Sequence, residues 1–263
     1  MIGIFDSGIG GLTVVKEVFQ QLPDYQLVYF GDTARTPYGN KSSELISEYA
    51  IQDVRFLIEK GAKLIVAACN TASAVAMYAV RKEFPDIPIF EVITPAVEKA
   101  TAISMTKRIG VIGTTATINS NIYQKLIKEK GADFTIIEKA CPLFVPLVEE
   151  NWQKSTEAKM IVRKYIAPLK LKSIDTLILG CTHYPLLKAM IQQKAGKNIS
   201  IVDPAHETIL SVQSYLKEHA DIADTLPKNA DHTFYFSDVT PKVREISTKW
   251  LGRNISLKKI HLG

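Results

Sequence analysis

Along this chain, short apolar runs alternate with longer segments in which apolar residues recur at the period of a helix. Over residues 42–60, for example, apolar side chains recur about every 3.6 positions. Strands that are apolar throughout are buried on both faces, which is typical of parallel sheets covered by helices. We therefore predict an α/β fold. The expected strands lie at 2–5, 26–30, 63–68, 87–90, 108–113, 134–137, 176–180, 200–202, 233–236 and within 255–261.

Composition narrows the class of protein further. The 263 residues include 46% hydrophobic and 22% charged residues, as in a globular domain, and no apolar run approaches the ~18 residues of a membrane span. The first residues carry no basic segment followed by a long apolar stretch, so we expect no secretory signal and no membrane association. The net charge of +5 is concentrated near the C-terminus, where a solvated face is favoured over an anion patch, and no nucleic-acid module appears.

Three cysteines, Cys69, Cys141 and Cys181, are far apart in the sequence and form no CxxC pair. This spacing argues against a disulfide framework and against a thiolate zinc site. Free thiols persist in a reducing compartment, so we expect a cytoplasmic protein without a bound metal.

Polar residues follow the expected strands at the point where each strand ends. Ligands of parallel α/β sheets bind outside the carboxyl ends of the strands, so these positions are the candidate site. They are Asp6 and Ser7, Asp32 and Thr33, Cys69, Asn70 and Thr71, Thr114, and Cys181, Thr182 and His183.

A weak internal repeat connects two of these positions. The segment "IGIFDS" at 2–7 is similar to "IGVIGT" at 109–114, and "LIVAACNT" at 64–71 is similar to "TLILGCTH" at 176–183. The two pairs are separated by similar distances along the chain, which suggests two related halves. Each half would then present one cysteine from an equivalent strand end.

A single strand-end cysteine is most simply a small buried hydrophobe. Two equivalent ones, each followed by polar residues and a probable helix start, favour chemistry instead. We expect Asn70 and Thr71 to cap a helix beginning near Ala72, so that the helix N-terminus lowers the pKa of Cys69. The same effect is expected at Cys181, where Pro185 suits a first helical turn.

His183 lies two residues from Cys181 and can orient or deprotonate it. Cys141 has no equivalent in the first half and is interpreted as structural. Two thiols on opposite faces of a ligand, one as thiolate and one as thiol, can remove a proton from carbon and return one on the other side. Such an exchange inverts a stereocentre.

At these residues the sequence closely resembles the glutamate racemases, cofactor-independent members of the aspartate/glutamate racemase superfamily. Five motifs carry the resemblance, in the family's order and across most of the chain. They are "IGIFDSGIGGLTV" at 2–14, "YFGDTARTPYG" at 29–39, "VAACNTAS" at 66–73, "CPLFVPLVEE" at 141–150 and "LGCTHYPLL" at 179–187.

The resemblance implies two similar α/β domains, related by a pseudo-two-fold axis, with the active site in the cleft between them. Residues 1–94 with 208–263 would form the first domain, and residues 95–207 the second. It also implies interconversion of L- and D-glutamate without a cofactor, to supply D-glutamate for peptidoglycan synthesis and the cell wall. A homodimer is one assembly consistent with it.

The family pattern assigns roles to residues of this sequence. Cys69 and Cys181 become the paired acid/base catalysts, with Asp6 beside Cys69, and with His183 and Glu149 (chosen over Glu150) beside Cys181. The residues expected to contact substrate are Asp6, Ser7, Tyr38, Gly39, Asn70, Thr71, Thr114, Thr182 and His183. Their hydroxyl, amide and backbone groups suit two substrate carboxylates.

Three alternatives stay open from the residues alone. Another racemase of the superfamily would act on aspartate or a hydantoin. A thiol-transfer enzyme would join Cys69 and Cys181 in a disulfide. A two-lobed binding protein would hold a small molecule without exchanging its hydrogens.

Overall fold

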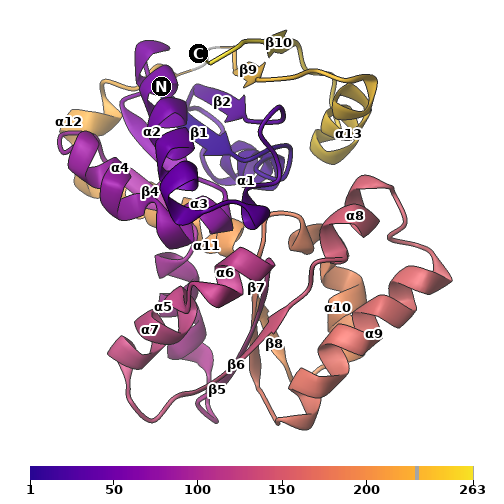
Figure 1. Ribbon diagram of the computed structural model, residues 1–263. Helices are drawn as coiled ribbons and strands as arrows, with labels where there is room; N and C mark the ends of the chain where they lie inside the picture. The colour runs from indigo at the N-terminus through magenta and orange to yellow at the C-terminus, as the bar shows by residue number, and fades with distance from the viewer. Residues whose placement is uncertain (229–230, 263) are drawn as a thin grey trace. The chain divides into compact units, whose positions relative to one another are not determined.

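The computed structural model describes residues 1–228 and 231–262. The chain forms two compact units, Met1–Val92 with Thr208–Gly263, and Ile93–Glu207. The chain passes from the second unit back to the first between Glu207 and Thr208, within helix α11 (Pro204–Glu218). Each unit contains its own parallel sheet, so the expected α/β class is confirmed (Figure 1).

The first unit is built on a six-stranded sheet in the order β10-β9-β2-β1-β3-β4. All of its strand pairs are parallel; Ile4, for example, lies beside Tyr29 of β2 and Val66 of β3. Strands β1, β2 and β3 are buried along their whole length, as their apolar sequences require. The strands are β1 (Ile2–Asp6), β2 (Leu27–Gly31), β3 (Leu64–Ala67), β4 (Ile89–Glu91), β9 (Thr233–Phe236) and β10 (Leu257–Lys259).

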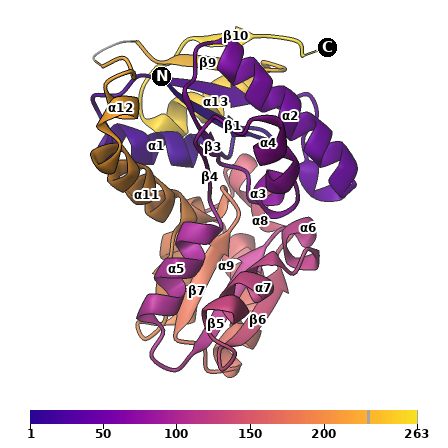
Figure 2. The ribbon, with the colours of Figure 1, turned by 90° about the vertical axis from the view of Figure 1, so that its left-hand side faces the viewer.

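Helices cover both faces of this sheet, with α2 and α4 on one face and α1 and α13 on the other (Figure 2). Helix α2 (Ser43–Glu59) matches the expected segment 42–60, and the Ser42 hydroxyl caps it by accepting a hydrogen bond from the Leu45 N–H. The other helical segments of the unit are α1 (Leu12–Gln21), η1 (Tyr38–Asn40), α3 (Asn70–Val75), α4 (Met77–Glu83), α12 (Ala220–Ala223) and α13 (Pro241–Leu251).

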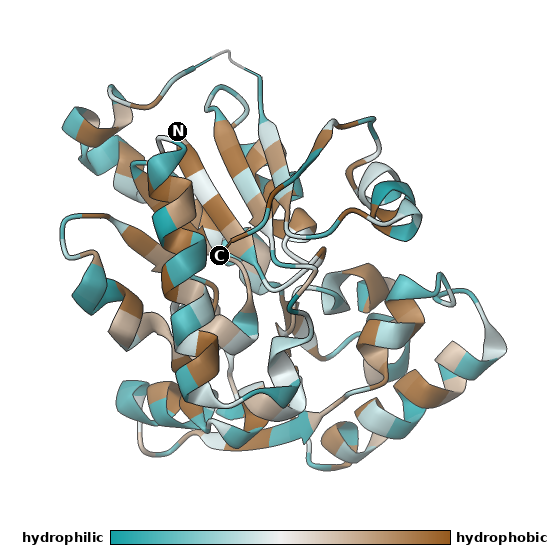
Figure 3. Ribbon diagram, turned by 45° about the horizontal axis from the view of Figure 1, so that its top comes forward, coloured by the Kyte–Doolittle hydropathy of each residue, from teal (hydrophilic) through white to brown (hydrophobic). Residues whose placement is uncertain are grey.

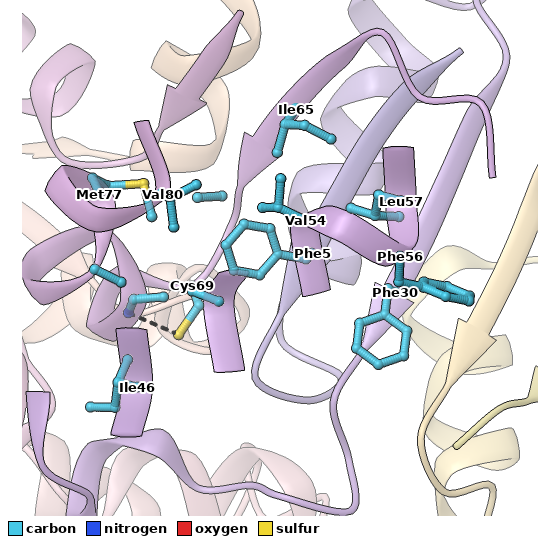
Figure 4. Packing of buried hydrophobic residues seen from close by; sticks show 14 of the residues in the cluster. Phe5, Phe30, Ile46, Val54, Phe56, Leu57, Ile65, Cys69, Met77 and Val80 are labelled. Atoms are coloured by element: carbon cyan, nitrogen blue, oxygen red, sulfur yellow. Dashed lines mark hydrogen bonds between the residues drawn. The ribbon is translucent and has the colours of Figure 1, made fainter. Parts of the chain in front are cut away.

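The core between α2 and the sheet reaches one of the predicted catalytic positions. Phe5 and Ile65 from the strands pack with Val54 and Leu57 of α2, and Cys69 lies at the edge of the same cluster (Figure 4). The thiol is therefore held by close-packed apolar side chains on one side.

The second unit has a four-stranded parallel sheet in the order β6-β5-β7-β8. Helices α5 and α7 pack together on one side, and α9 and α10 on the other (Figure 1). The strands are β5 (Arg108–Gly113), β6 (Thr135–Ala140), β7 (Thr176–Gly180) and β8 (Ser200–Val202). The helices are α5 (Thr94–Ile103), α6 (Thr115–Asn119), α7 (Ile122–Lys130), α8 (Phe144–Glu149), α9 (Thr156–Leu171), η2 (Tyr184–Leu187) and α10 (Lys188–Ala195).

Hydropathy follows these layers. The inner strands of the first unit are largely hydrophobic, whereas the helices alternate between hydrophobic and hydrophilic positions (Figure 3). Within residues 1–228 and 231–262, no helix is long and apolar enough to cross a membrane.

Candidate active site

Cys69 follows β3 directly, and its neighbours come from the adjacent strand end. Because β1 and β3 are parallel neighbours, the residues after Phe5 and after Ala67 meet at one edge of the sheet. The Cys69 thiol donates to the Ser7 hydroxyl oxygen, with 3.4 Å between sulfur and oxygen. The structure thus brings Asp6, Ser7 and Cys69 together within the first unit.

The helix that follows Cys69 begins earlier than expected. Asn70 and Thr71 are its first residues rather than its caps, and the cap is Cys69 itself, whose sulfur accepts from the Ala72 N–H at 3.5 Å (Figure 4). The prediction that Asn70 and Thr71 cap the helix is therefore wrong. Both are buried in the first turn of α3, beside the thiol.

The expected lowering of the Cys69 pKa is also wrong for this ligand-free structure. Burial, followed by the negative charge of Asp6, raises the pKa of Cys69 to about 12, and the hydrogen bonds that Ser7 and Ala72 donate to the thiolate form offset only part of this rise. Burial outweighs the short six-residue helix because a desolvated thiolate is costly. Cys69 is consequently a thiol near neutral pH.

The loop after β1 is held tightly around Asp6. The Gly8 N–H donates to Asp6 Oδ2 at 2.9 Å, and the buried Tyr29 hydroxyl donates to the Gly8 carbonyl at 2.8 Å. A Cβ atom at Gly11 would lie 2.6 Å from the Asp6 Cβ, so this glycine permits the close approach. Asp6 is itself only 1% exposed.

Tyr38 and Gly39 belong to η1, which packs against α3. The Tyr38 side chain is buried, and its hydroxyl lies 2.5 Å from Asp32 Oδ2 and 3.0 Å from Asp53 Oδ2. Because the phenol is engaged inside the unit, contact between this segment and a substrate would use the backbone.

Cys181 follows β7 in the second unit and precedes a tight turn. The Tyr184 N–H donates to the Cys181 carbonyl at 3.0 Å, and η2 begins at Tyr184 with Pro185 in its first turn. The predicted place of Pro185 is confirmed, but His183 and not Cys181 occupies the cap position. The thiol therefore lacks the helix N-terminus that the sequence led us to expect.

The neighbours of Cys181 form a chain of polar contacts instead. His183 Nδ1 lies 3.9 Å from the Cys181 sulfur and 3.5 Å from the Thr182 hydroxyl, and its Nε2 lies 2.9 Å from Glu149 Oε1. Burial disfavours a charged imidazole, but the contacts with Cys181 and Glu149 outweigh it and raise the pKa of His183 to about 10. Glu149, at the end of α8, is the glutamate that reaches His183, whereas Glu150 is exposed.

Thr114 and Cys141 follow two other strands of the second sheet, β5 and β6. Thr114 caps α6 by accepting from the Thr117 N–H, and it follows β5, which pairs with β7 from Ile109 to Gly113. It therefore ends at the same sheet edge as Cys181. Cys141 is fully buried, and burial raises its pKa to about 12, in keeping with the structural role predicted for it.

The sequence analysis did not identify the buried polar residues that form a network with Tyr38 of η1. Arg35, Asp53 and Ser237 surround Asp32, and none of them was a candidate. One signal was available for Asp53, since it lies on the buried stripe of α2 with Ala50 and Leu57. A carboxylate inside an apolar stripe indicates a buried polar network.

The fold agrees with the comparisons to known proteins. Residues 10–212 match the Asp/Glu/Hydantoin racemase family, and the chain belongs to this family of amino-acid racemases. Glutamate racemases from Geobacter metallireducens and Enterococcus faecalis are each 43% identical to it, covering 95% and 100% of this chain and 92% and 96% of their own. The structure of glutamate racemase isoform RacE1 from Bacillus anthracis has a TM-score of 0.94 at 37% identity, covering 100% of this chain and 97% of its own.

A further solved structure was determined with a ligand. Glutamate racemase from Francisella tularensis, in complex with D-glutamate, has a TM-score of 0.92 at 37% identity and covers 99% of this chain and 97% of its own. These relatives, each at least 37% identical to the chain over nearly its whole length, are thus glutamate racemases.

Proposed function

We propose that this protein interconverts L- and D-glutamate by moving the Cα proton between the thiols of Cys69 and Cys181. The observation that carries the proposal is the pair of half-sites, each with a cysteine at the end of a buried parallel strand and a charged group beside it. The high identity to glutamate racemases supports glutamate as the substrate.

Cys69 is suited to the role of acid in the first encounter with substrate. Its raised pKa keeps the proton on sulfur near neutral pH. A thiol in this state can protonate a carbanion that approaches it, and it then becomes the base for the reverse reaction. Until that step, the negative charge of Asp6 favours the protonated thiol of Cys69.

Cys181 is suited to the role of base. His183 carries a proton near neutral pH, and an imidazolium next to sulfur stabilises the thiolate that removes a proton from carbon. Glu149 fixes the ring through its contact with Nε2, which leaves Nδ1 facing the sulfur. The roles of the two cysteines exchange when the opposite enantiomer is the substrate.

The residues around the thiols can hold the two carboxylates and the ammonium group of glutamate. Ser7, Asn70, Thr71 and Thr182 offer hydroxyl and amide donors, and Asp6 can accept from the ammonium group. Donors fixed around the α-carboxylate stabilise the negative charge that develops there when the Cα proton leaves. Tyr38 and Gly39 would add backbone groups, and Thr114 is assigned to substrate binding beside Cys181.

Racemisation in deuterated water tests the activity. The purified protein, without added cofactor, is incubated separately with L- and D-glutamate, while optical rotation and deuterium at Cα are followed. We expect both enantiomers to approach the same racemic mixture with incorporation of deuterium. Absence of exchange with both enantiomers would contradict the proposal and would favour a binding protein.

Aspartate and a hydantoin are the matched alternative substrates. Exchange that is faster with either than with glutamate would assign the protein to another branch of the family. The thiol-transfer alternative predicts that mild oxidant joins Cys69 to Cys181, and thiol titration measures this. We expect both thiols to remain free under conditions that support racemisation.

We further propose that the protein acts in the cytoplasm, where its D-glutamate would supply peptidoglycan synthesis and so maintain the cell wall and cell shape. Its partner is then a small amino acid rather than a nucleic acid or a membrane. Sedimentation analysis, with and without glutamate, would distinguish a monomer from a homodimer.

A further inference from the structure

The Tyr38 hydroxyl has one proton but two carboxylate oxygens within hydrogen-bond distance. Asp32 Oδ2 lies 2.5 Å away and Asp53 Oδ2 lies 3.0 Å away. A phenol donates once and accepts through its lone pairs, so two bonds to carboxyl groups require one carboxyl group to donate. One of the two aspartates must therefore carry a proton.

The other contacts identify which aspartate it is. Asp32 accepts from Arg35 Nε at 2.6 Å through Oδ2, and from the Ser237 hydroxyl at 2.8 Å through Oδ1. Both oxygens of Asp32 thus face donors. Asp53 accepts from Arg35 Nη2 at 3.0 Å through Oδ1, which leaves Oδ2 as the oxygen that faces Tyr38.

We propose that Asp53 is a neutral carboxylic acid that donates from Oδ2 to the Tyr38 hydroxyl, which in turn donates to ionised Asp32. This series of hydrogen bonds positions Tyr38 and Gly39 for substrate. The inference deepens the proposed function and rests on it for the role of these two residues. Asp53 is a positioning residue in this account, because it acts through Tyr38.

The charge inventory agrees with this assignment. Asp32 and Asp53 have fully buried side chains, and Arg35 beside them is 20% exposed. With Asp53 protonated, one guanidinium balances one carboxylate, whereas two carboxylates would leave an uncompensated buried charge. Burial, together with the negative charges of Asp32 and Asp6, raises the pKa of Asp53, although Arg35 and Tyr38 act in the opposite direction.

Packing connects this hydrogen-bonded series to Cys69, the predicted catalytic residue. Tyr38 belongs to the same buried cluster as Cys69, and η1 contacts α3, which Cys69 caps. Arg35 also stacks over the Tyr49 ring at 4.1 Å from its centroid, which restrains the guanidinium that holds both aspartates. Displacement of the Tyr38 hydroxyl would therefore move the backbone next to the predicted site.

Infrared spectroscopy of the substrate-free protein tests the protonation state without relying on activity. We expect a carbonyl band of a buried carboxylic acid near neutral pH, shifted in deuterated water and absent in Asp53→Asn. Asp238→Asn, at an exposed ion pair with Lys259, is the control that leaves the band in place. Absence of the band in the wild type, or its loss in Asp32→Asn but not in Asp53→Asn, overturns the inference.

Kinetics test the positioning role. Asparagine can donate from Nδ2 to Tyr38 and accept from Arg35, so Asp53→Asn should lower kcat/KM less than about threefold, because its hydrogen bonds are kept. Asp53→Leu and Asp32→Asn should each lower it on the order of tenfold or more, because buried donors lose their acceptors. Equal losses in Asp53→Asn and Asp32→Asn, with both variants folded by circular dichroism, would contradict the inference.

The two readouts separate this inference from the proposed function. If the wild type fails to racemise glutamate, the proposed function is wrong, and the infrared band still decides the protonation of Asp53. If the wild type racemises glutamate but the band is missing, only the inference is wrong.

Discussion

The two predicted catalytic cysteines have opposite electrostatic surroundings. Cys69 has the carboxylate of Asp6 as its charged neighbour, whereas Cys181 has the imidazole of His183. A carboxylate disfavours a thiolate and an imidazolium favours it. The two cysteines therefore differ in the charged group that lies beside each of them, as the proposed acid and base roles require.

Alkylation should reveal this difference. Near pH 8, at about the pKa of a free thiol, we expect iodoacetamide to modify Cys181 faster than Cys69 and Cys141. The reason is that the pKa of Cys69 and that of Cys141 are each raised to about 12, so their thiolate fractions are small. Peptide mass spectrometry over time measures the three rates. Faster modification of Cys69 than of Cys181 would contradict this description.

His183 should make stability depend on pH in a defined direction. Its pKa rises from 6.5 to about 10 in the folded protein, so the folded state holds the proton more tightly. The stabilisation is fully present below pH 6.5 and is lost as pH rises through about 10. We expect the free energy of unfolding of the wild type, relative to that of His183→Asn, to fall across this range.

Urea unfolding at several pH values measures that difference, because groups common to both proteins cancel. Glu149→Gln is the companion variant, since it removes the negative charge of the carboxylate next to His183 Nε2 and leaves the imidazole ring in place. If the free energy of unfolding of the wild type, relative to that of His183→Asn, stays constant or increases with pH, then His183 is not held in its charged form.

Among the elements of the first unit, the loop that follows β1 approaches the end of β2 closely, and the position of the residues after Asp6 depends on this approach. A Cβ atom added at Gly31 would lie against the Gly8 carbonyl oxygen and 2.7 Å from the Phe236 ring, so neither the backbone nor the buried ring could easily yield. Tyr29, two residues earlier on β2, holds the same carbonyl. The end of β2 therefore sets the position of the loop that follows Asp6.

Gly31→Ala should destabilise the protein by about 1–3 kcal/mol or more, as expected for overpacking. Gly110→Ala is the matched control, since its Cβ would meet the tip of the Ile174 side chain at 2.5 Å, and such a tip can rotate away. Thermal unfolding of both variants measures the difference. A smaller loss in Gly31→Ala than in Gly110→Ala would contradict the importance of this approach.

Most elements were predictable from the sequence, and so was the position of the candidate site residues at strand ends. The short apolar runs predicted strands β5, β7, β8 and β9 with their observed bounds. In β5 and β7 the signal is clear because both faces of the strand are buried. The helix after Cys69 begins at Asn70, earlier than predicted, whereas the helical turn after Cys181 contains Pro185 as predicted but has His183 at its cap. Local capping preferences cannot show that a thiol caps α3, or that a 3₁₀ turn precedes α10.

The electrostatics of the site were the least predictable part. The pKa of Cys69 depends on desolvation and on Asp6, which is 63 residues away in sequence but adjacent across the sheet edge. The cluster of Arg35, Asp32 and Asp53 likewise forms only when α2 packs on the sheet. Sequence patterns predict which residues lie at strand ends, whereas burial and long-range neighbours determine their protonation.

For the whole molecule, the chain leaves the first unit after Val92 and returns at Thr208. The sequence placed these crossings after residues 94 and 207, using the family resemblance and the internal repeat. Strands β9 and β10 of the returning segment complete the first sheet beside β2. Cys69 thus lies just after β3, an inner strand of the first sheet, and Cys181 lies just after β7, an inner strand of the second.

In the proposed mechanism, Cys69 and Cys181 transfer protons to and from opposite faces of one Cα. Racemisation of L-glutamate in deuterated water, stopped at low conversion, tests it most directly in the wild type, Cys69→Ser, Cys181→Ser and the control Cys141→Ala. We expect deuterium in the D-product well before it appears in the remaining L-substrate, near-wild-type rates in the control, and a loss on the order of a thousandfold in each serine variant. Equal labelling of substrate and product, or full activity in either serine variant, would contradict the account.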